Sequence, residues 1–133
     1  MSSSNFEKIR EFHSSFNLPN NFSPTLANKK SEELRLSLIE EEYNELLDAL
    51  EKRDVLGVAD ALTDLLYVTY GMGAVYGIDL DRCYAEVHAS NMTKLGENGK
   101  PIYRKDGKVL KGPIYRPPNL KKVLFGDNNA SST

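Results

Sequence analysis

The chain has a single cysteine, no tryptophan and no long uninterrupted hydrophobic run. Because Cys83 is alone, an internal disulfide is excluded, which argues against a secreted disulfide framework. The longest apolar stretch, residues 65–78, contains Thr69 and three glycines, and it is shorter than the roughly 20 residues that span a bilayer. The Ser-rich start lacks the apolar centre of a signal peptide. These absences predict a cytoplasmic protein with no membrane partner.

An excess of basic charge is also missing. The 133 residues carry 17 lysines and arginines against 19 aspartates and glutamates, for a formal net charge of -2. Such a balance argues against a nucleic acid polymer as partner. The hydrophobic share of 40% and the charged share of 27% are typical of a globular protein. We therefore predict one domain over residues 1–125, followed by a disordered tail over residues 126–133.

Apolar residues recur at helical spacing in four segments, which end where glycine, proline or a loop begins. These segments are residues 3–16, 30–52, 54–76 and 79–95. Ser31 and Asp54 are expected to cap the second and third helices, and Gly77 to end the third. The sequence therefore predicts an all-α protein with a four-helix core.

Glycine, proline and lysine dominate after Gly96, and the helical periodicity is lost. The pair Asp106-Gly107 lies between two runs of β-compatible residues, which predicts a short β-hairpin with a two-residue turn. The prolines that follow favour an extended chain. The helical core should therefore be followed by a hairpin and a loop-rich tail.

The second and third helical segments carry acidic residues in unusual positions. Glu42 and Glu45 fall on one side of the second helix with Glu41 beside them, at the border of its apolar face. Asp60 and Asp64 lie one turn apart within residues 59–68, which are otherwise almost wholly apolar. Carboxylates on a buried helix need a cationic partner or a metal ion.

Two helices joined by the short connection at residues 52–54 should pack antiparallel, which allows the two acidic stripes to meet. A cluster of carboxylate oxygens suits Mg²⁺, with Mn²⁺ as a substitute, better than Zn²⁺. Such an ion supports cleavage of a phosphoanhydride by a positioned water. A structural cluster paired with lysine or arginine from other segments is the second interpretation, and the residues alone leave both open.

The ordered set of motifs resembles a known superfamily. Glu41-Glu42-x-x-Glu45, followed by an acidic helix that ends in Asp64-Leu65-Leu66-Tyr67, resembles the all-α nucleoside triphosphate pyrophosphatases. That superfamily includes MazG, dCTP pyrophosphatases, dimeric dUTPases and phosphoribosyl-ATP pyrophosphohydrolase. Residues 86–94 and 107–113 resemble its MazG-like subgroup. The chain departs from the usual EExxE and ExxD signature, because Ala61 or Gly57 occupies the position of the second motif's glutamate. The number of bound metal ions is therefore left open.

The resemblance implies a specific reaction. Glu41, Glu42, Glu45, Asp60 and Asp64 would hold Mg²⁺, and Glu41 would also act as the catalytic base. Water would attack between the α- and β-phosphates of a nucleoside triphosphate, such as dUTP or dCTP, to give a monophosphate and pyrophosphate. The alternatives are phosphoribosyl-ATP as substrate and a non-catalytic helical dimerisation module.

Five further residues are candidates for substrate contacts. The resemblance favours Asn91 and Lys94, which share one face of the fourth helix. Lys108 and Lys111 flank the hairpin, where they either reach phosphates or protect an edge strand. Tyr67 is expected close to the stripe of aspartates.

The third segment is so apolar that four helices of one small chain should not cover it. We therefore expect an oligomeric helical bundle, a homodimer or a dimer of dimers, with the second and third segments at the interface. Cys83 is expected in the core and His13 at the surface.

Overall fold

The computed structural model describes the backbone of residues 3–131 and the side chains of residues 3–126. Its helices are α1 (Asn5–Ser15), α2 (Lys29–Glu51), α3 (Val55–Tyr76), α4 (Leu80–Met92) and α5 (Leu120–Ser131). The described residues contain no extended strand, so the predicted all-α class is confirmed. The chain forms two compact units, one that ends at Leu80 and one that begins at Asp81.

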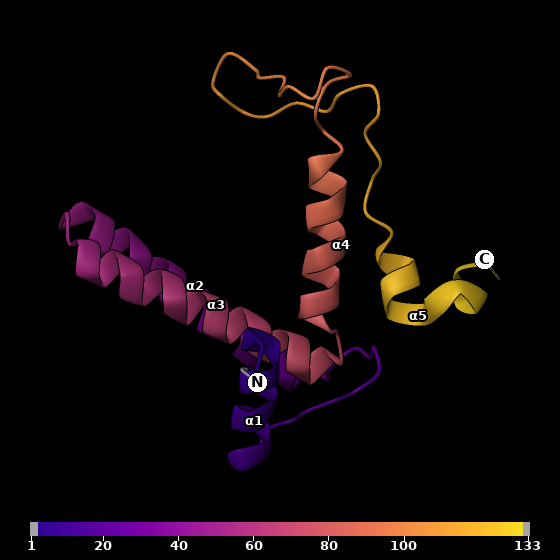
Figure 1. Cartoon of the computed structure of the whole chain (residues 1–133). Helices are drawn as coiled ribbons and strands as arrows, with labels where there is room; N and C mark the ends of the chain where they lie inside the picture. Colours follow the sequence, from indigo (N-terminus) through magenta and orange to yellow (C-terminus); the bar gives the residue numbers. More distant parts are fainter. Residues whose placement is uncertain (1–2, 132–133) are drawn as a thin grey trace. The chain divides into compact units, whose positions relative to one another are not determined.

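The first unit is built on the antiparallel pair α2 and α3, which lie side by side in Figure 1. Asp54 caps α3 as predicted, because its Oδ1 accepts a hydrogen bond from the Gly57 amide at 3.1 Å. The predicted cap of α2 is wrong. Asn28 takes this role, and its Oδ1 accepts from the Ser31 amide at 2.9 Å, so that Ser31 lies in the first turn.

Two glycines of α3 allow close approach to α2. A Cβ on Gly57 would lie 3.1 Å from the Cβ of Ala49, and a Cβ on Gly71 would lie 3.1 Å from Nη1 of Arg35. The two contacts are fourteen residues apart on each helix, which is four turns. They therefore set the register of the antiparallel pair over most of its length.

Helix α1 packs on α3 and completes the core of the first unit. This core consists of Phe6, Ile9 and Ala74, with Tyr70 and Leu80 packed against it. Gly77 ends α3 as predicted, with a left-handed φ of 65° that an L-residue adopts at a cost.

The predicted surface position of His13 is wrong, because this side chain is only 2% exposed. Its Nδ1 lies 2.8 Å from the carbonyl oxygen of Pro19 and donates to it. His13 follows Phe6 by seven residues and Ile9 by four, so all three side chains lie on the buried face of α1. The loop after α1 folds back and covers the imidazole, a contact that periodicity does not encode.

The apolar residues of α3 are unevenly covered. The second half is buried from Gly73 to Tyr76, whereas Val55, Leu56 and Leu62 in the first half are exposed. A single chain therefore leaves part of α3 uncovered, as its apolar sequence led us to expect.

In the second unit the chain leaves α4, forms a long loop and returns along α4 (Figure 1). Ser90 Oγ donates to the Arg116 carbonyl at 2.6 Å, and Glu86 accepts from Arg116 Nη1 at 2.7 Å. Cys83 is buried, as predicted. The sequence reading missed α5, because it took the two prolines before Asn119 as the mark of an extended chain. Asn119 caps this helix, accepting from the Lys122 amide at 3.1 Å.

The predicted hairpin is reduced to one antiparallel bridge between Tyr103 and Val109. The Arg104 amide donates to the Lys108 carbonyl at 2.8 Å, so the turn contains three residues and not the predicted two. Gly107, with a φ of 90°, supplies the left-handed position of this longer turn.

Beyond the loop, the helical backbone of α5 is interrupted at Gly126, whose φ is 78°. The side chains of residues 127–131 and the whole of residues 132–133 lie outside the described part. The predicted disorder over residues 126–133 therefore stays a prediction. Among the described residues, every helix is too short or too polar to cross a membrane.

Candidate metal centre

Three carboxylates converge between α2 and α3. One oxygen each of Glu42, Glu45 and Asp64 lies within 4.8 Å of the other two. Glu42 is seven residues from Ala49 and from Arg35, and Asp64 is seven from Gly57 and from Gly71. The site therefore lies midway between the two close helix contacts, two turns from each.

The charges of this group are poorly compensated. Burial raises the pKa of Glu42 above its ordinary value, and so do a hydrogen bond with Glu45 and the charges of Glu45, Asp64 and Asp60. Burial likewise raises the pKa of Asp64, aided by the charges of Asp60 and Glu45. Glu42 Oε2 is buried and has no hydrogen-bond partner. A divalent cation would satisfy this oxygen and neutralise the repulsion.

Basic residues of the same chain do not fill this role. The ion pairs of the described residues join Lys29 to Glu32, Lys52 to Asp48, Arg104 to Asp106 and Arg116 to Glu86. Not one of them includes a carboxylate of the converging group. The donor set of three oxygens with no nitrogen or sulfur fits Mg²⁺ or Mn²⁺.

The other two predicted ligands lie outside this group. Asp60 is exposed but close enough for its charge to raise the pKa of Glu42 and Asp64. Glu41 is exposed on α2 and does not belong to the converging set. Ala61, one of the two positions where the resemblance leads one to expect a glutamate, is only 1% exposed. A carboxylate would be buried at that position.

Tyr67 and the cations predicted to contact substrate have different surroundings. Tyr67 is half-exposed on α3, with its ring packed edge-on against Phe12 at a centroid distance of 5.6 Å. In the second unit, Lys111 Nζ lies 4.8 Å above the Tyr115 ring. Lys108 is exposed directly after the three-residue turn.

Asn91 and Lys94 were predicted to share a face of the fourth helix, but α4 ends at Met92, so Lys94 lies in the turn beyond it. Both residues nevertheless line one pocket of about 400 Å³. Neither side chain makes a hydrogen bond or an ion pair within the described residues. Both groups are therefore available to a ligand.

Arg35 was missed by sequence reasoning. Its side chain is 6% exposed and forms no ion pair within the described residues. Burial lowers the pKa of its guanidinium. The only available signal was its position, seven residues before Glu42 on the same stripe of α2.

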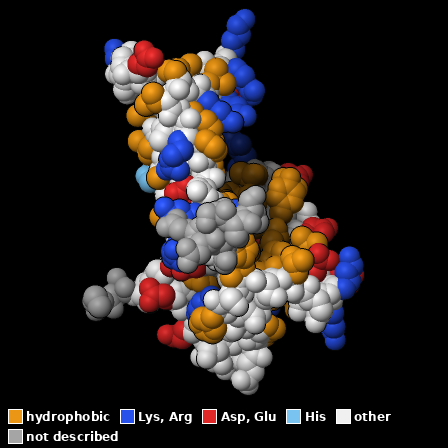
Figure 2. All heavy atoms as spheres, turned by 90° about the vertical axis from the view of Figure 1, so that its right-hand side faces the viewer, with side chains coloured by type: hydrophobic (Ala, Val, Ile, Leu, Met, Phe, Trp, Pro, Cys, Tyr) orange, Lys and Arg blue, Asp and Glu red, His pale blue; other side chains and the backbone are white. Residues whose placement is uncertain are grey.

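An uneven distribution of charge was also missed, because the overall net charge is only -2. Residues 93–125 contain nine lysines and arginines against two acidic residues, whereas residues 1–92 contain eight against sixteen. Figure 2 shows blue side chains gathered at the top of the view, over the loop that follows α4. Counting charge in segments would have revealed this.

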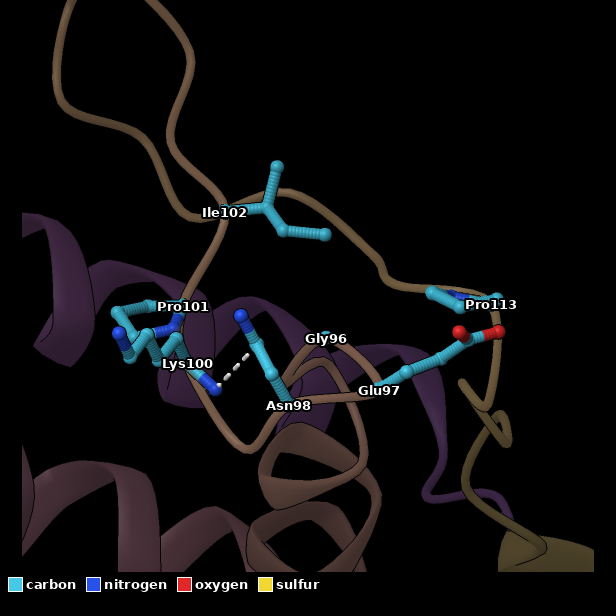
Figure 3. Close-up of a pocket in the computed structure, with 7 residues that line it drawn as sticks. All are labelled: Gly96, Glu97, Asn98, Lys100, Pro101, Ile102 and Pro113. Atoms are coloured by element: carbon cyan, nitrogen blue, oxygen red, sulfur yellow. Dashed lines mark hydrogen bonds between the residues drawn. The ribbon is translucent and has the colours of Figure 1, made fainter.

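The loop after α4 also contains a hollow of about 660 Å³. Figure 3 shows Glu97 and Lys100 on opposite sides of it, so that their charges do not converge on a common point. Asn98 accepts a hydrogen bond from the Lys100 amide at 3.0 Å, which is a local turn contact. This hollow therefore lacks a set of groups that would hold a ligand.

Three similarities to known proteins describe the chain. A family model described as phosphoribosyl-ATP pyrophosphohydrolase matches residues 9–91. An uncharacterized protein of Acanthamoeba polyphaga mimivirus, L479, is 34% identical over 125 residues, which are 90% of this chain and 47% of the viral protein. The chain thus spans about half the length of that relative. A crystal structure of a candidate NTP pyrophosphohydrolase from Exiguobacterium sp. 255-15 aligns with 24% identity and a TM-score of 0.48, over 91% of this chain and 92% of the other.

Proposed function

The chain belongs to the phosphoribosyl-ATP pyrophosphohydrolase family, and on that premise we propose that it hydrolyses a nucleoside triphosphate between the α- and β-phosphates. The products are a monophosphate and pyrophosphate, and the proposed substrate is a deoxynucleotide such as dUTP or dCTP. Membership of the family confirms the superfamily inferred from the sequence motifs, and it agrees with the predicted class of enzyme.

The observation that carries this proposal is the convergence of Glu42, Glu45 and Asp64 around a buried oxygen that has no partner. These three residues would hold Mg²⁺, or Mn²⁺ in its place, with Asp60 as a fourth carboxylate nearby. The bound ion would supply charge neutralisation of the phosphates and a more acidic water. Three carboxylates leave room in an octahedral shell for water and phosphate oxygens.

Other residues of the chain are assigned supporting roles. Glu41, exposed beside Glu42 on α2, is the proposed base that accepts the proton of the attacking water. Lys94, Lys108 and Lys111 are proposed to contact the substrate, since they belong to the strongly basic residues 93–125. Asn91 is proposed as a further contact because it lines the same pocket as Lys94.

Tyr67 is proposed as a further substrate contact. It lies three residues after Asp64 on α3 and is half-exposed, so one edge of its ring is free of Phe12.

We further propose a homodimer or a dimer of dimers. Leu47, Leu50, Leu56, Leu62 and Leu66 are all about half or more exposed on α2 and α3. Apolar residues gathered on neighbouring helices mark a surface for association. Light scattering after size exclusion would show a mass of at least two chains, and a monomer would contradict this proposal.

The single domain over residues 1–125 and the cytoplasmic location also remain proposals. The location rests on the lone, buried Cys83, which fits a reducing compartment.

Phosphoribosyl-ATP is the second candidate substrate, because the matching family model carries its name. Its hydrolysis uses the same bond and the same carboxylates. A non-catalytic helical module is the third candidate. It predicts neither release of pyrophosphate nor stabilisation by a metal ion.

Pyrophosphate release from a panel of nucleoside triphosphates and phosphoribosyl-ATP, with Mg²⁺ and with chelator, tests the function. Mg²⁺-dependent pyrophosphate from one or two compounds would establish the reaction and identify the substrate. Orthophosphate as product would show that a different bond is cleaved. A chain that releases neither product from any compound would be the non-catalytic module.

A further inference from the structure

The second unit contains a positively charged pocket, at the point where the chain that returns along α4 enters α5 (Figure 1). The pocket has a volume of about 610 Å³. The side chains that line it belong to Arg82, Glu86, Arg116, Asn119, Lys122 and Val123. Three positive charges therefore stand against one negative charge, which gives these side chains a net charge of +2.

Glu86 holds the parts of this pocket together. Its Oε2 accepts a hydrogen bond from the Asn119 amide at 2.6 Å and another from Arg116 Nη1 at 2.7 Å. These two bonds lower the pKa of Glu86 below its ordinary value, and the charges of Arg116 and Lys122 contribute to the same effect. The carboxylate is therefore ionised at neutral pH and fixes both the guanidinium and the start of α5.

The guanidinium of Arg116 is held on one side only. Its Nη1 donates to Glu86 and, at 3.4 Å, to the Pro117 carbonyl, whereas Nε and Nη2 donate to no atom of the described residues. The Arg116 side chain is 49% exposed, so this second edge can be reached from solvent. Arg104 uses the same two groups to hold both oxygens of Asp106. The free edge of Arg116 can bind two oxygens of a phosphate in the same way.

Two further cations and an amide add to the donors of the pocket. Arg82 lies one turn before Glu86 on α4, and Lys122 lies in the first turn of α5. Asn119 Oδ1 accepts from the Lys122 amide at 3.1 Å, which leaves the Nδ2 group of Asn119 to donate. Charged donors and a neutral N–H donor around one hollow are the groups that bind an anion.

We propose that this pocket binds a phosphate group, carried by inorganic phosphate or by a small phosphate ester. Two phosphate oxygens accept from Nε and Nη2 of Arg116, and the charges of Arg82 and Lys122 offset the negative charge. A phosphate dianion matches the net charge of +2. All the lining residues belong to the second unit, and the pocket uses neither a metal ion nor the carboxylates of α2 and α3. Binding there is therefore independent of the proposed reaction.

Titration of the full chain, followed by ¹H–¹⁵N NMR in chelator at constant ionic strength, tests this site. Inorganic phosphate and glycerol 3-phosphate should shift the amide signals of Arg116, Asn119 and Lys122, whereas glycerol should leave them in place. The amides of Glu97 and Lys100, which line a different hollow, should stay unchanged. Tighter binding of the ester would identify a phosphate ester as the ligand, and equal affinities would identify the free ion.

Charge-matched variants test the contribution of single residues. Lys122→Gln should weaken binding by about tenfold, because one charged contact is lost. The control is Lys121→Gln, which removes the same charge from an exposed neighbour that does not line the pocket. Arg116→Lys keeps the charge but removes the paired N–H groups, and should weaken binding by a similar factor.

Three outcomes would overturn the site. The first is a titration in which the amides of Arg116, Asn119 and Lys122 do not shift. The second is an equal shift of the amides throughout residues 93–125, which would show non-specific attraction to the basic segment. The third is an equal loss of affinity in Lys121→Gln and Lys122→Gln. Normal phosphate binding by Glu42→Gln, with unchanged pyrophosphate release by Lys122→Gln, would support a site distinct from the metal centre.

Discussion

Glu42 of α2 and Asp64 of α3 present their carboxylates to each other midway between two points where glycine brings the helices into close contact. Packing at Gly57 and Gly71 holds the two charges together, and their raised pKa values show the cost of this proximity. The folded chain therefore contains a repulsion that a cation would relieve. This relationship makes the stability of the protein sensitive to metal and to pH.

Glu42→Gln should raise the melting temperature in chelator at about pH 7.5, because it removes one charge from the group without removing the side chain. The same variant should lose most of the stabilisation by Mg²⁺. In the parent protein that stabilisation reaches about 2.7 kcal/mol when Mg²⁺ is at about 100 times its Kd. Thermal unfolding followed by circular dichroism measures both effects.

Glu41→Gln is the matched control for stability, since this neighbouring carboxylate lies outside the converging group. It should unfold like the parent protein in chelator and respond normally to Mg²⁺. A Glu42→Gln variant that is less stable than the parent in chelator would contradict the repulsion and indicate a structural role for the carboxylate.

In chelator, the stability of the protein should fall as pH rises through the raised pKa values of Glu42 and Asp64. The folded state binds these protons more tightly than the unfolded state, whose reference values are 4.5 and 3.8. The contribution is therefore complete below those values and lost above the folded pKa. Mg²⁺ should reverse the loss at neutral pH, because it competes with protons for the same oxygens. A stability that falls over this range in Glu42→Gln as steeply as in the parent protein would exclude the assignment.

The proposed base makes a prediction about rate. Glu41→Gln should lower kcat by about 10²- to 10⁴-fold, the usual contribution of a general base. Because this residue lies outside the converging carboxylates, the Mg²⁺ concentration for half-maximal stabilisation should stay unchanged. Steady-state pyrophosphate release and Mg²⁺ titration of unfolding separate the two effects. Near-normal kcat would remove Glu41 from the mechanism and point to another carboxylate.

The lowered pKa of His13 predicts a second dependence of stability on pH, of opposite sign to that of Glu42 and Asp64. Burial, together with the charges of Arg35 and Arg10, lowers its pKa below the ordinary 6.5, although the hydrogen bond to Pro19 opposes this. The unfolded state therefore takes up the proton first, and stability is lost as pH falls below about 6.5. Denaturant unfolding between about pH 7.5 and pH 5.5 should show this loss, and His13→Gln should flatten it. An equally steep loss in the variant would place the responsible group elsewhere.

Gly77→Ala should destabilise the first unit strongly. The left-handed φ of 65° disfavours alanine, and its Cβ would lie 2.1 Å from the carbonyl oxygen of Ser23. The combined cost should be at least about 2 kcal/mol, since backbone strain and a steric overlap add. Gly99→Ala is the comparison, because it has a φ of 75° but no atom within 4 Å of the added Cβ. Equal losses in both variants would show that strain alone acts at Gly77.

Local signals in the sequence predicted local features. Asp54 begins α3 and Gly77 ends it, each through contacts within a few residues, and both predictions were confirmed. Asn28 displaced the predicted Ser31 because two residues of the right chemistry lay close together in the sequence. Helix α5 was not predicted, because the two prolines before it were taken to favour an extended chain. The capping residue Asn119, which follows them, was not considered.

These local signals do not predict contacts between segments that are far apart in the sequence. The burial of His13 depends on a loop that folds back over α1, and the burial of Arg35 depends on Gly71, thirty-six residues later. The pocket beside Asn91 and Lys94 depends on the approach of Gly112 to the Leu95 carbonyl oxygen. Each of these is a contact between residues far apart in sequence.

The sequence by itself determined the all-helical class, the acidic stripes of α2 and α3 and the change of composition after Gly96, because periodicity and composition are properties of neighbouring residues. Only the tertiary structure decided which acids meet. Close packing at Gly57 and Gly71 sets the register of two long helices, and that register brings Glu42, Glu45 and Asp64 within 4.8 Å while it leaves Glu41 outside. A different register of the same two helices would place different carboxylates opposite one another, because rotation by one residue turns a helical side chain by about 100°.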